Sequence, residues 1–170
     1  MMLNVVFGGK GVGLMNMITY AILAVFICGL MIGRTPEYLG KKIEGREMKL
    51  AALCIIIHPL LILAFSALAV GTSAGLADIT NPGYHGLSQV LYEFASSAAN
   101  NGSGFEGLAD NTLFWNITTG IVMFFGRYLS MILQLAIADS LMKKRFVNES
   151  AGTLHTDTMS FAVILVFVVY

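Results

Sequence analysis

The sequence predicts an all-α polytopic membrane protein in which one helix enters the bilayer and returns without crossing it. Three observations favour this class. Of the 170 residues, 56% are hydrophobic and 12% are charged, whereas an ordinary soluble domain carries roughly 25% charged residues. The apolar residues gather in long segments that contain few or no charges. Two of these segments are separated by residues 71–112, whose two ends must emerge on the same side of the membrane.

Two uncharged segments, residues 14–32 and 50–70, are each long enough to cross the bilayer as a helix. A helix rises about 1.5 Å per residue, so roughly 20 residues span a hydrocarbon core of about 30 Å. A third apolar segment, residues 113–142, is long enough to span with a tilt or a break. The last one, residues 159–170, is too short to span, and we expect the sequence to be a fragment of a longer protein.

The basic residues predict the orientation of these spans. Five of the ten Lys and Arg residues lie in residues 34–49, and three more lie at 143–145. Residues 71–112 contain four acids and no Lys or Arg. Because cytoplasmic loops carry an excess of basic residues, we expect the two basic loops in the cytoplasm and residues 71–112 on the outer side.

A re-entrant helix is predicted within the outer segment. Residues 86–99 are compatible with a helix, follow the turn signal NPG at 81–83 and precede the Gly- and Asn-rich residues 100–104. Irregular backbone at membrane depth is tolerated only where it is buried in protein or lines a watery cavity. Residues 100–104 are therefore a candidate pore lining, and an ordinary outward loop beside a surface helix is the alternative.

The composition of this loop favours a monovalent cation as ligand. Gly102 and Gly104 permit backbone conformations that turn carbonyl oxygens toward one axis, where they can replace the water around an ion. The preceding helix would aim the negative end of its dipole at the same place. The sequence has no basic tract with interleaved aromatics that would indicate nucleic acid. It also has no phosphate-binding loop or organised nucleophile, so we expect no catalytic residues in this chain.

Four segments of the chain are distinctive: VVFGGKGVGL (5–14), AVFICGLMIGRTPEYLGKKIEGREMKL (24–50), NPGYHGLSQVLYEFASSAANNGSGFEGLADNTLFWN (81–116) and FFGRYLSMI (124–132). They resemble the C-terminal part of the potassium-binding A subunit of Kdp-type potassium-transporting ATPases. The likeness covers almost the whole chain, and GLMIGRTPEYLGKKI is its most distinctive part. That family belongs to the potassium transporter superfamily, in which four helix, pore-loop, helix repeats surround one selectivity filter.

The resemblance implies a division of the chain into parts of two repeats. Residues 1–33 correspond to the second helix of the third repeat, and residues 34–49 to a cytoplasmic loop. Residues 50–142 correspond to the complete fourth repeat. Residues 143–158 form a second cytoplasmic loop, and residues 159–170 open the final span.

Within the fourth repeat, the resemblance implies a span over 50–70, a pore helix over about 86–99 and a broken span over 113–142. Between the last two lies the filter loop, residues 100–104, with one potassium ion at the backbone of Gly102. The implied filter residues are Asn100, Asn101, Gly102 and Ser103.

The resemblance also implies a role for residues 8–13 and for Arg127. Residues 8–13 correspond to an intramembrane gate loop, and a plain outer linker is the alternative; the glycines concerned are Gly8, Gly9, Gly11 and Gly13. Arg127 is expected beside the ion path, and a structural ion pair that holds a break at Gly126 is the alternative. Lys10 and Asn4 depart from the family pattern, which more often has a small or apolar residue and an acid at these two positions.

The implied function is potassium binding and translocation within an ATP-driven, high-affinity uptake complex of the bacterial plasma membrane. A separate P-type B subunit would hydrolyse ATP, and small C and F subunits would complete the complex. Membrane lipid would surround it. Arg34, Glu37 and Lys41 are candidate contacts with the B subunit, and a solvated loop is the alternative. Two other functions remain open: a subunit of a Trk or Ktr uptake system, and a membrane assembly subunit without a pore.

Overall fold

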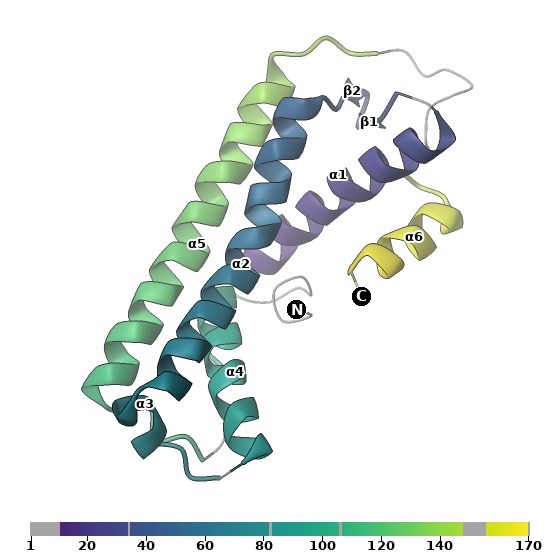
Figure 1. Ribbon diagram of the computed structural model, residues 1–170. Coiled ribbons are helices and arrows are strands. Elements are labelled where there is room, and N and C mark those ends of the chain that lie inside the picture. The colour runs from purple at the N-terminus through teal and green to yellow at the C-terminus, as the bar shows by residue number, and fades with distance from the viewer. Residues whose placement is uncertain (1–10, 34, 82, 106, 148–155, 170) are drawn as a thin grey trace.

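The computed structural model describes residues 11–33, 35–81, 83–105, 107–147 and 156–169. Within these ranges the chain forms helices and one short β-hairpin (Figure 1). The helices are α1 (Val12–Ile32), α2 (Gly45–Gly71), α3 (Ser73–Ala77), α4 (Tyr84–Ala99), α5 (Leu113–Met142) and α6 (Met159–Val169), and the strands are β1 (Glu37–Tyr38) and β2 (Lys41–Lys42).

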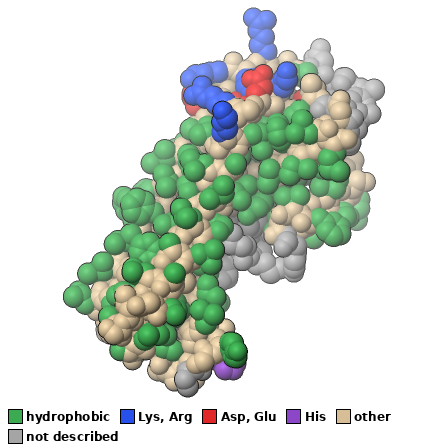
Figure 2. Space-filling view, in the orientation of Figure 1, with side chains coloured by type: hydrophobic (Ala, Val, Ile, Leu, Met, Phe, Trp, Pro, Cys, Tyr) green, Lys and Arg blue, Asp and Glu red, His purple; other side chains and the backbone are tan. Residues whose placement is uncertain are grey.

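Three of these helices, α1, α2 and α5, are long and apolar enough to cross a membrane. The predicted class, an all-α polytopic membrane protein, is confirmed. α6 is apolar but shorter, with 11 residues. Figure 2 shows Lys and Arg side chains gathered at the end of the molecule where α2 begins and α5 ends, with hydrophobic side chains over most of the remaining face. This is the distribution expected where basic loops face the cytoplasm.

α2 and α5 lie side by side, and each half of this pair carries a different partner (Figure 1). α4 packs against the half that holds the end of α2 and the start of α5, around Phe94, Val122 and Trp115. α1 packs against the other half, around Val25, Ala51 and Ile137. α4 therefore accompanies α2 and α5 over only part of their length.

α2 begins several residues before its apolar segment because its first turn is capped. Glu44 and Glu47 form a capping box, in which each side chain accepts a hydrogen bond from the other residue's backbone N–H. This arrangement satisfies two backbone donors that a helix start otherwise leaves open. Pro59 lies inside α2, and the helix continues past it to Gly71.

The predicted break in the span over 113–142 is wrong, because α5 is one unbroken α-helix of 30 residues. Gly126, the residue at which we expected the break, is buried inside this helix. Its lack of a side chain serves a close contact instead, since a Cβ at this position would overlap the carbonyl oxygen of Ala98 in α4. The glycine lets two helices approach rather than interrupting one of them.

The first basic loop, between α1 and α2, contains structure that the sequence does not predict. β1 and β2 pair antiparallel, with Glu37 opposite Lys42 and Tyr38 opposite Lys41. The two connecting residues, Leu39 and Gly40, both have positive φ, at 51° and 70°. A two-residue turn of this kind matches the twist of a hairpin. The hairpin fixes the direction in which the chain enters α2.

Candidate ion-binding site

α4 ends beside the middle of α5, which places the predicted filter loop about half-way along that helix. Ala98, in the last turn of α4, lies against Gly126 of α5. Gly126 follows Leu113, the first residue of α5, by 126 − 113 = 13 positions, or about 20 Å along the helix at about 1.5 Å per residue. The short helix and the loop that follows it therefore have the depth required of a re-entrant segment.

The chain turns sharply at the end of α4. Asn100 has a left-handed backbone, with φ of 53°, and its N–H bonds back to the carbonyls of Ser96 and Ser97. The N–H of Asn101 also donates to the Ser96 carbonyl, at 3.0 Å. The Asn100 side-chain amide reaches α5, where Nδ2 donates to the Met123 carbonyl at 3.2 Å. These bonds fix the first two residues of the filter loop at the helix terminus.

The rest of the filter loop presents its backbone to open space. Gly102 has φ of 78°, in the region that favours glycine, and a Cβ at Gly102 or Gly104 would meet no other atom within 4 Å. Among the described residues, nothing donates a hydrogen bond to the carbonyl oxygens of the four predicted filter residues, Asn100, Asn101, Gly102 and Ser103. Carbonyl oxygens that no protein donor occupies can bind a cation in place of its water.

A small cavity of about 160 Å³ lies against the filter loop, and Gly102, Ser103 and Gly104 form part of its wall. Two acids, Glu93 of α4 and Asp110, line the same cavity. The C-terminal end of α4 also carries the negative pole of the helix dipole. Together these groups give the surroundings of the loop a negative potential, which favours a cation.

The predicted gate residues fall only partly within the described residues. Gly8 and Gly9, together with Lys10 and Asn4, lie outside them. Gly11 has φ of 96° and precedes the first residue of α1. Gly13, which we had placed in the gate loop, is helical and buried in the first turn of α1. α1 therefore begins within the predicted gate loop, at Val12, and a gating role stays a prediction.

Arg127 is half-buried in α5, one residue beyond the contact with Ala98. No acid among the described residues lies within ion-pair distance of it. Asp139, later in the same helix, binds Lys143, with Nζ 2.7 Å from Oδ2. An ion pair that holds a helix break is not found in this part of the chain, and a role beside the ion path stays a prediction.

Two of the three candidate partner contacts are engaged within the chain itself. The Nζ of Lys41 donates to the carbonyl of Lys144 at 2.5 Å and lies 4.8 Å from the centre of the Phe146 ring. Glu37 is buried, and the Thr35 hydroxyl donates to its carboxylate at 3.4 Å. Arg34 lies outside the described residues. Contact with a partner subunit through these residues stays a prediction.

A buried ion pair at the end where α2 begins and α5 ends was not predicted from the sequence. Glu47 is 1% exposed and accepts hydrogen bonds from Ser140 and from Lys144, whose Nζ lies 2.8 Å away. Burial lowers the pKa of Lys144, but hydrogen bonds to Glu47 and Glu44 outweigh it, so the pKa is raised. The spacing of Glu44 and Glu47 is a sequence signal for this helix start, whereas the pairing with Lys144 depends on the tertiary fold.

A second missed feature is a polar cluster between the three spans. Asn16 Oδ1 accepts hydrogen bonds from Ser130 and Gln134, each at 3.2 Å. Gln134 also donates to Thr19 at 3.1 Å, and Cys54 lies 3.3 Å from Ser130. The sequence signal for this cluster was the spacing of its polar residues within two apolar segments. Asn16 and Thr19 are three residues apart, and Ser130 and Gln134 are four apart, so each pair lies on one side of its helix. Hydrogen bonds of this kind join membrane helices whose apolar faces have no preference for one another over lipid.

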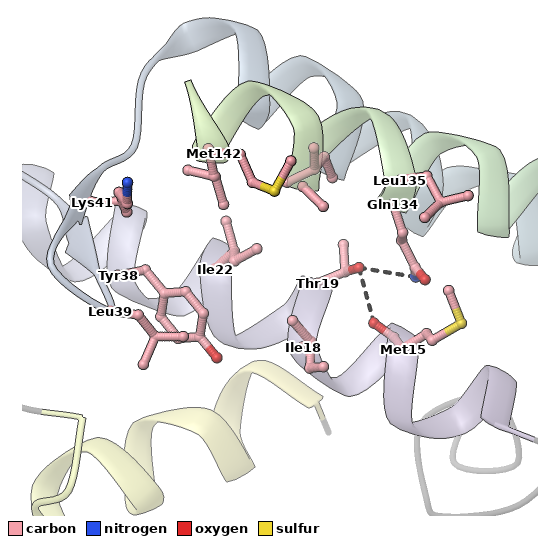
Figure 3. Close-up of a pocket in the computed structure, with 13 residues that line it drawn as sticks. Met15, Ile18, Thr19, Ile22, Tyr38, Leu39, Lys41, Gln134, Leu135 and Met142 are labelled. Atoms are coloured by element: carbon pink, nitrogen blue, oxygen red, sulfur yellow. Dashed lines mark hydrogen bonds between the residues drawn. The ribbon is translucent and has the colours of Figure 1, made fainter. Parts of the chain in front are cut away.

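The same cluster borders the larger cavity shown in Figure 3, of about 790 Å³, between α1, the hairpin and α5. Thr19 and Gln134 provide polar groups on its wall, and apolar side chains such as Ile18, Ile22 and Leu135 provide most of the rest. Lys41 and Tyr38 lie toward its hairpin end. This cavity is separate from the filter loop, since the two share no lining residue.

Comparison with known proteins shows the family of this chain. A sequence model of the family described as potassium-transporting ATPase A subunit matches residues 1–170. A relative from Clostridium acetobutylicum, described as potassium-transporting ATPase potassium-binding subunit, is 65% identical over 169 residues. The match covers 99% of this chain and 30% of the relative's length. Because the family pattern extends over the whole chain, the protein belongs to the potassium-transporting ATPase A subunit family.

Proposed function

We propose that this chain is the potassium-binding and translocating part of an ATP-driven potassium uptake complex. The ion binds from the outer side, at the backbone carbonyls of Asn100, Asn101, Gly102 and Ser103. The open carbonyls at the end of a half-length helix carry this proposal. The negative end of the α4 dipole and the nearby carboxylates of Glu93 and Asp110 support a cation as the ligand.

In the same proposal, a separate P-type B subunit hydrolyses ATP and receives the ion from this subunit. Small C and F subunits complete a complex in the bacterial plasma membrane. The relative's description names a potassium-binding subunit of such an ATPase, and the three membrane-length helices fit an integral membrane component. The family match favours this complex over a Trk or Ktr system.

The test is Gly102→Ala in the full-length protein within its complex, with ATP hydrolysis measured against potassium concentration. Gly102 has φ of 78°, and a left-handed backbone costs a residue with a Cβ about 1–2 kcal/mol. We expect the half-saturating potassium concentration to rise by about 5- to 30-fold, the equivalent of that cost. Gly71→Ala is the matched control, because Gly71 lies on an exposed helix end with open space around it.

An assembled Gly102→Ala complex with wild-type potassium dependence would contradict the proposal. That result would favour the alternative of an assembly subunit without a pore. Rubidium uptake into vesicles that contain the same complex gives a second readout of the same site. Uptake should fall together with the apparent potassium affinity in Gly102→Ala and stay at the wild-type level in Gly71→Ala.

A further inference from the structure

We propose that Tyr92 of α4 determines the ion selectivity of the filter loop by holding Ser103 at a fixed distance from the pore helix. The inference rests on the proposed function, since it assigns a specificity-determining role within the same site. Tyr92 does not touch the ion in this proposal. It acts through Ser103, and is therefore a positioning residue.

The contacts lie on one face of α4. The Tyr92 hydroxyl is 2.9 Å from the Ser103 hydroxyl, and the Ser96 hydroxyl is 3.3 Å from the same atom. Tyr92 and Ser96 are four residues apart and so lie on the same side of the helix. The ring of Phe105 then packs on the ring of Tyr92, with centroids 5.6 Å apart. The filter loop thus runs back along the helix from which it came.

These contacts leave Gly102 between two fixed points. On one side, Asn101 is fixed by the hydrogen bond of its N–H to Ser96. On the other, Ser103 is fixed by the Tyr92 and Ser96 hydroxyls. Gly102 itself is exposed, and a Cβ there would have no neighbour. The position of its carbonyl therefore depends on the two anchors rather than on packing of its own.

Tyr92 is the stronger of the two hydroxyl anchors on Ser103. Its oxygen is closer than that of Ser96, and packing of its ring against Phe105 fixes the direction of the hydroxyl. A serine hydroxyl, by contrast, rotates about a short side chain. Selection between alkali ions depends on the position, number and field strength of the carbonyls around the ion. Loosening one anchor should therefore weaken discrimination between ions rather than abolish binding.

The experiment compares Tyr92→Phe with Tyr84→Phe in the full-length protein within its complex. Both changes remove one hydroxyl from α4, but Tyr84 is 92% exposed at the start of that helix and far from the filter loop in sequence. ATP hydrolysis is measured against the concentrations of potassium and rubidium. For Tyr92→Phe we expect the half-saturating potassium concentration to rise by about 2- to 10-fold, the range produced by the loss of one hydrogen bond. We also expect the preference for potassium over rubidium to narrow, with an unchanged maximal rate.

Ser103→Ala removes the hydrogen bond to Tyr92 from the loop side, together with the longer one to Ser96, and carries the same prediction if the Tyr92→Phe complex does not assemble. The double variant should lose no more selectivity than Ser103→Ala alone, because that change already removes the interaction with Tyr92. Wild-type selectivity in the assembled Tyr92→Phe or Ser103→Ala complex would overturn the inference, as would a fall in maximal rate alone. A wild-type complex without any potassium dependence would overturn the proposed function itself, which separates the two failures.

Discussion

At the scale of single residues, three positions show how the proposed site is formed without a charged side chain as ligand. Gly126 lets the carbonyl end of α4 come against α5 at mid-depth. Asn100 ends α4 in a left-handed conformation and ties the turn to α5 through the Met123 carbonyl. Gly102 then supplies the conformation that leaves the loop carbonyls open. None of these residues provides a charged ligand, so the backbone itself is the proposed binding group.

The close approach at Gly126 predicts the effect of adding one methyl group. In Gly126→Ala, the new Cβ meets the Ala98 backbone, which cannot rotate away as a flexible side chain would. We expect a loss of about 1–3 kcal/mol in the free energy of unfolding, as for other overpacked sites. Gly120→Ala is the matched control in the same helix, because a Cβ there meets nothing within 4 Å. The control should be neutral or more stable by up to about 1 kcal/mol, and equal thermal unfolding of both variants would contradict this account.

The buried ion pair between Lys144 and Glu47 predicts that two neighbouring lysines contribute differently to the free energy of unfolding. Lys144→Met leaves the carboxylate of Glu47 buried without its cation, which costs about 1–3 kcal/mol or more. Lys143→Met removes only an exposed pair with Asp139 and should cost at most about 1 kcal/mol. Thermal unfolding of the two variants should therefore separate them clearly. Similar losses would mean that the pair with Glu47 does not contribute to the folded state.

The same pair predicts a dependence on pH with a defined sign. The pKa of Lys144 is raised above its ordinary value of 10.5, so the folded state holds the proton more tightly than the unfolded state. The stabilisation is fully present below 10.5 and is lost as the pH rises through the raised pKa. The difference in unfolding temperature between wild type and Lys144→Met should stay constant from neutral pH to that value and shrink above it. A difference that already shrinks between neutral pH and 10.5 would contradict the assignment.

At the scale of elements, the sequence predicts helices well and their interruptions poorly. Long apolar segments mark α1, α2 and α5, and a helix between two turn signals marks α4. The start of α2 lies earlier than the apolar segment because a polar capping box extends it. The break expected in α5 is absent because Gly126 serves a contact with another helix, which no local pattern reveals.

The candidate site, too, could be predicted from the sequence only in part. The left-handed turn and open carbonyls of the filter loop follow from its glycines and asparagines, so its position could be predicted from the sequence. Its attachment to Tyr92 could not, because that contact requires the loop to fold back along α4. The hairpin was missed for a related reason, since Leu39 adopts a positive φ that is rare for its residue type.

At the scale of the molecule, the two halves of the helix bundle are stabilised by different kinds of contact. The half around α4 is joined by aromatic packing of Phe94, Trp115 and Phe65 beside the filter loop. The other half is joined by the hairpin, the Glu47 ion pair and the polar cluster around Asn16. The chain spans about 30% of the length of the relative. The proposed ion site lies between the two halves: the aromatic half around α4, and the half that contains the hairpin, the Glu47 ion pair and the polar cluster.

The central claim is that a potassium ion binds the main chain of residues 100–104. The most direct test is hydrogen exchange of this backbone in the full-length protein, with potassium compared against an equal concentration of choline. Ion binding should hold the loop in one conformation, so we expect slower exchange at Asn101, Gly102 and Ser103 with potassium, while the exposed start of α4 at Tyr84 stays unchanged. Equal exchange rates in the two solutions, in a protein that is folded and assembled, would contradict the account.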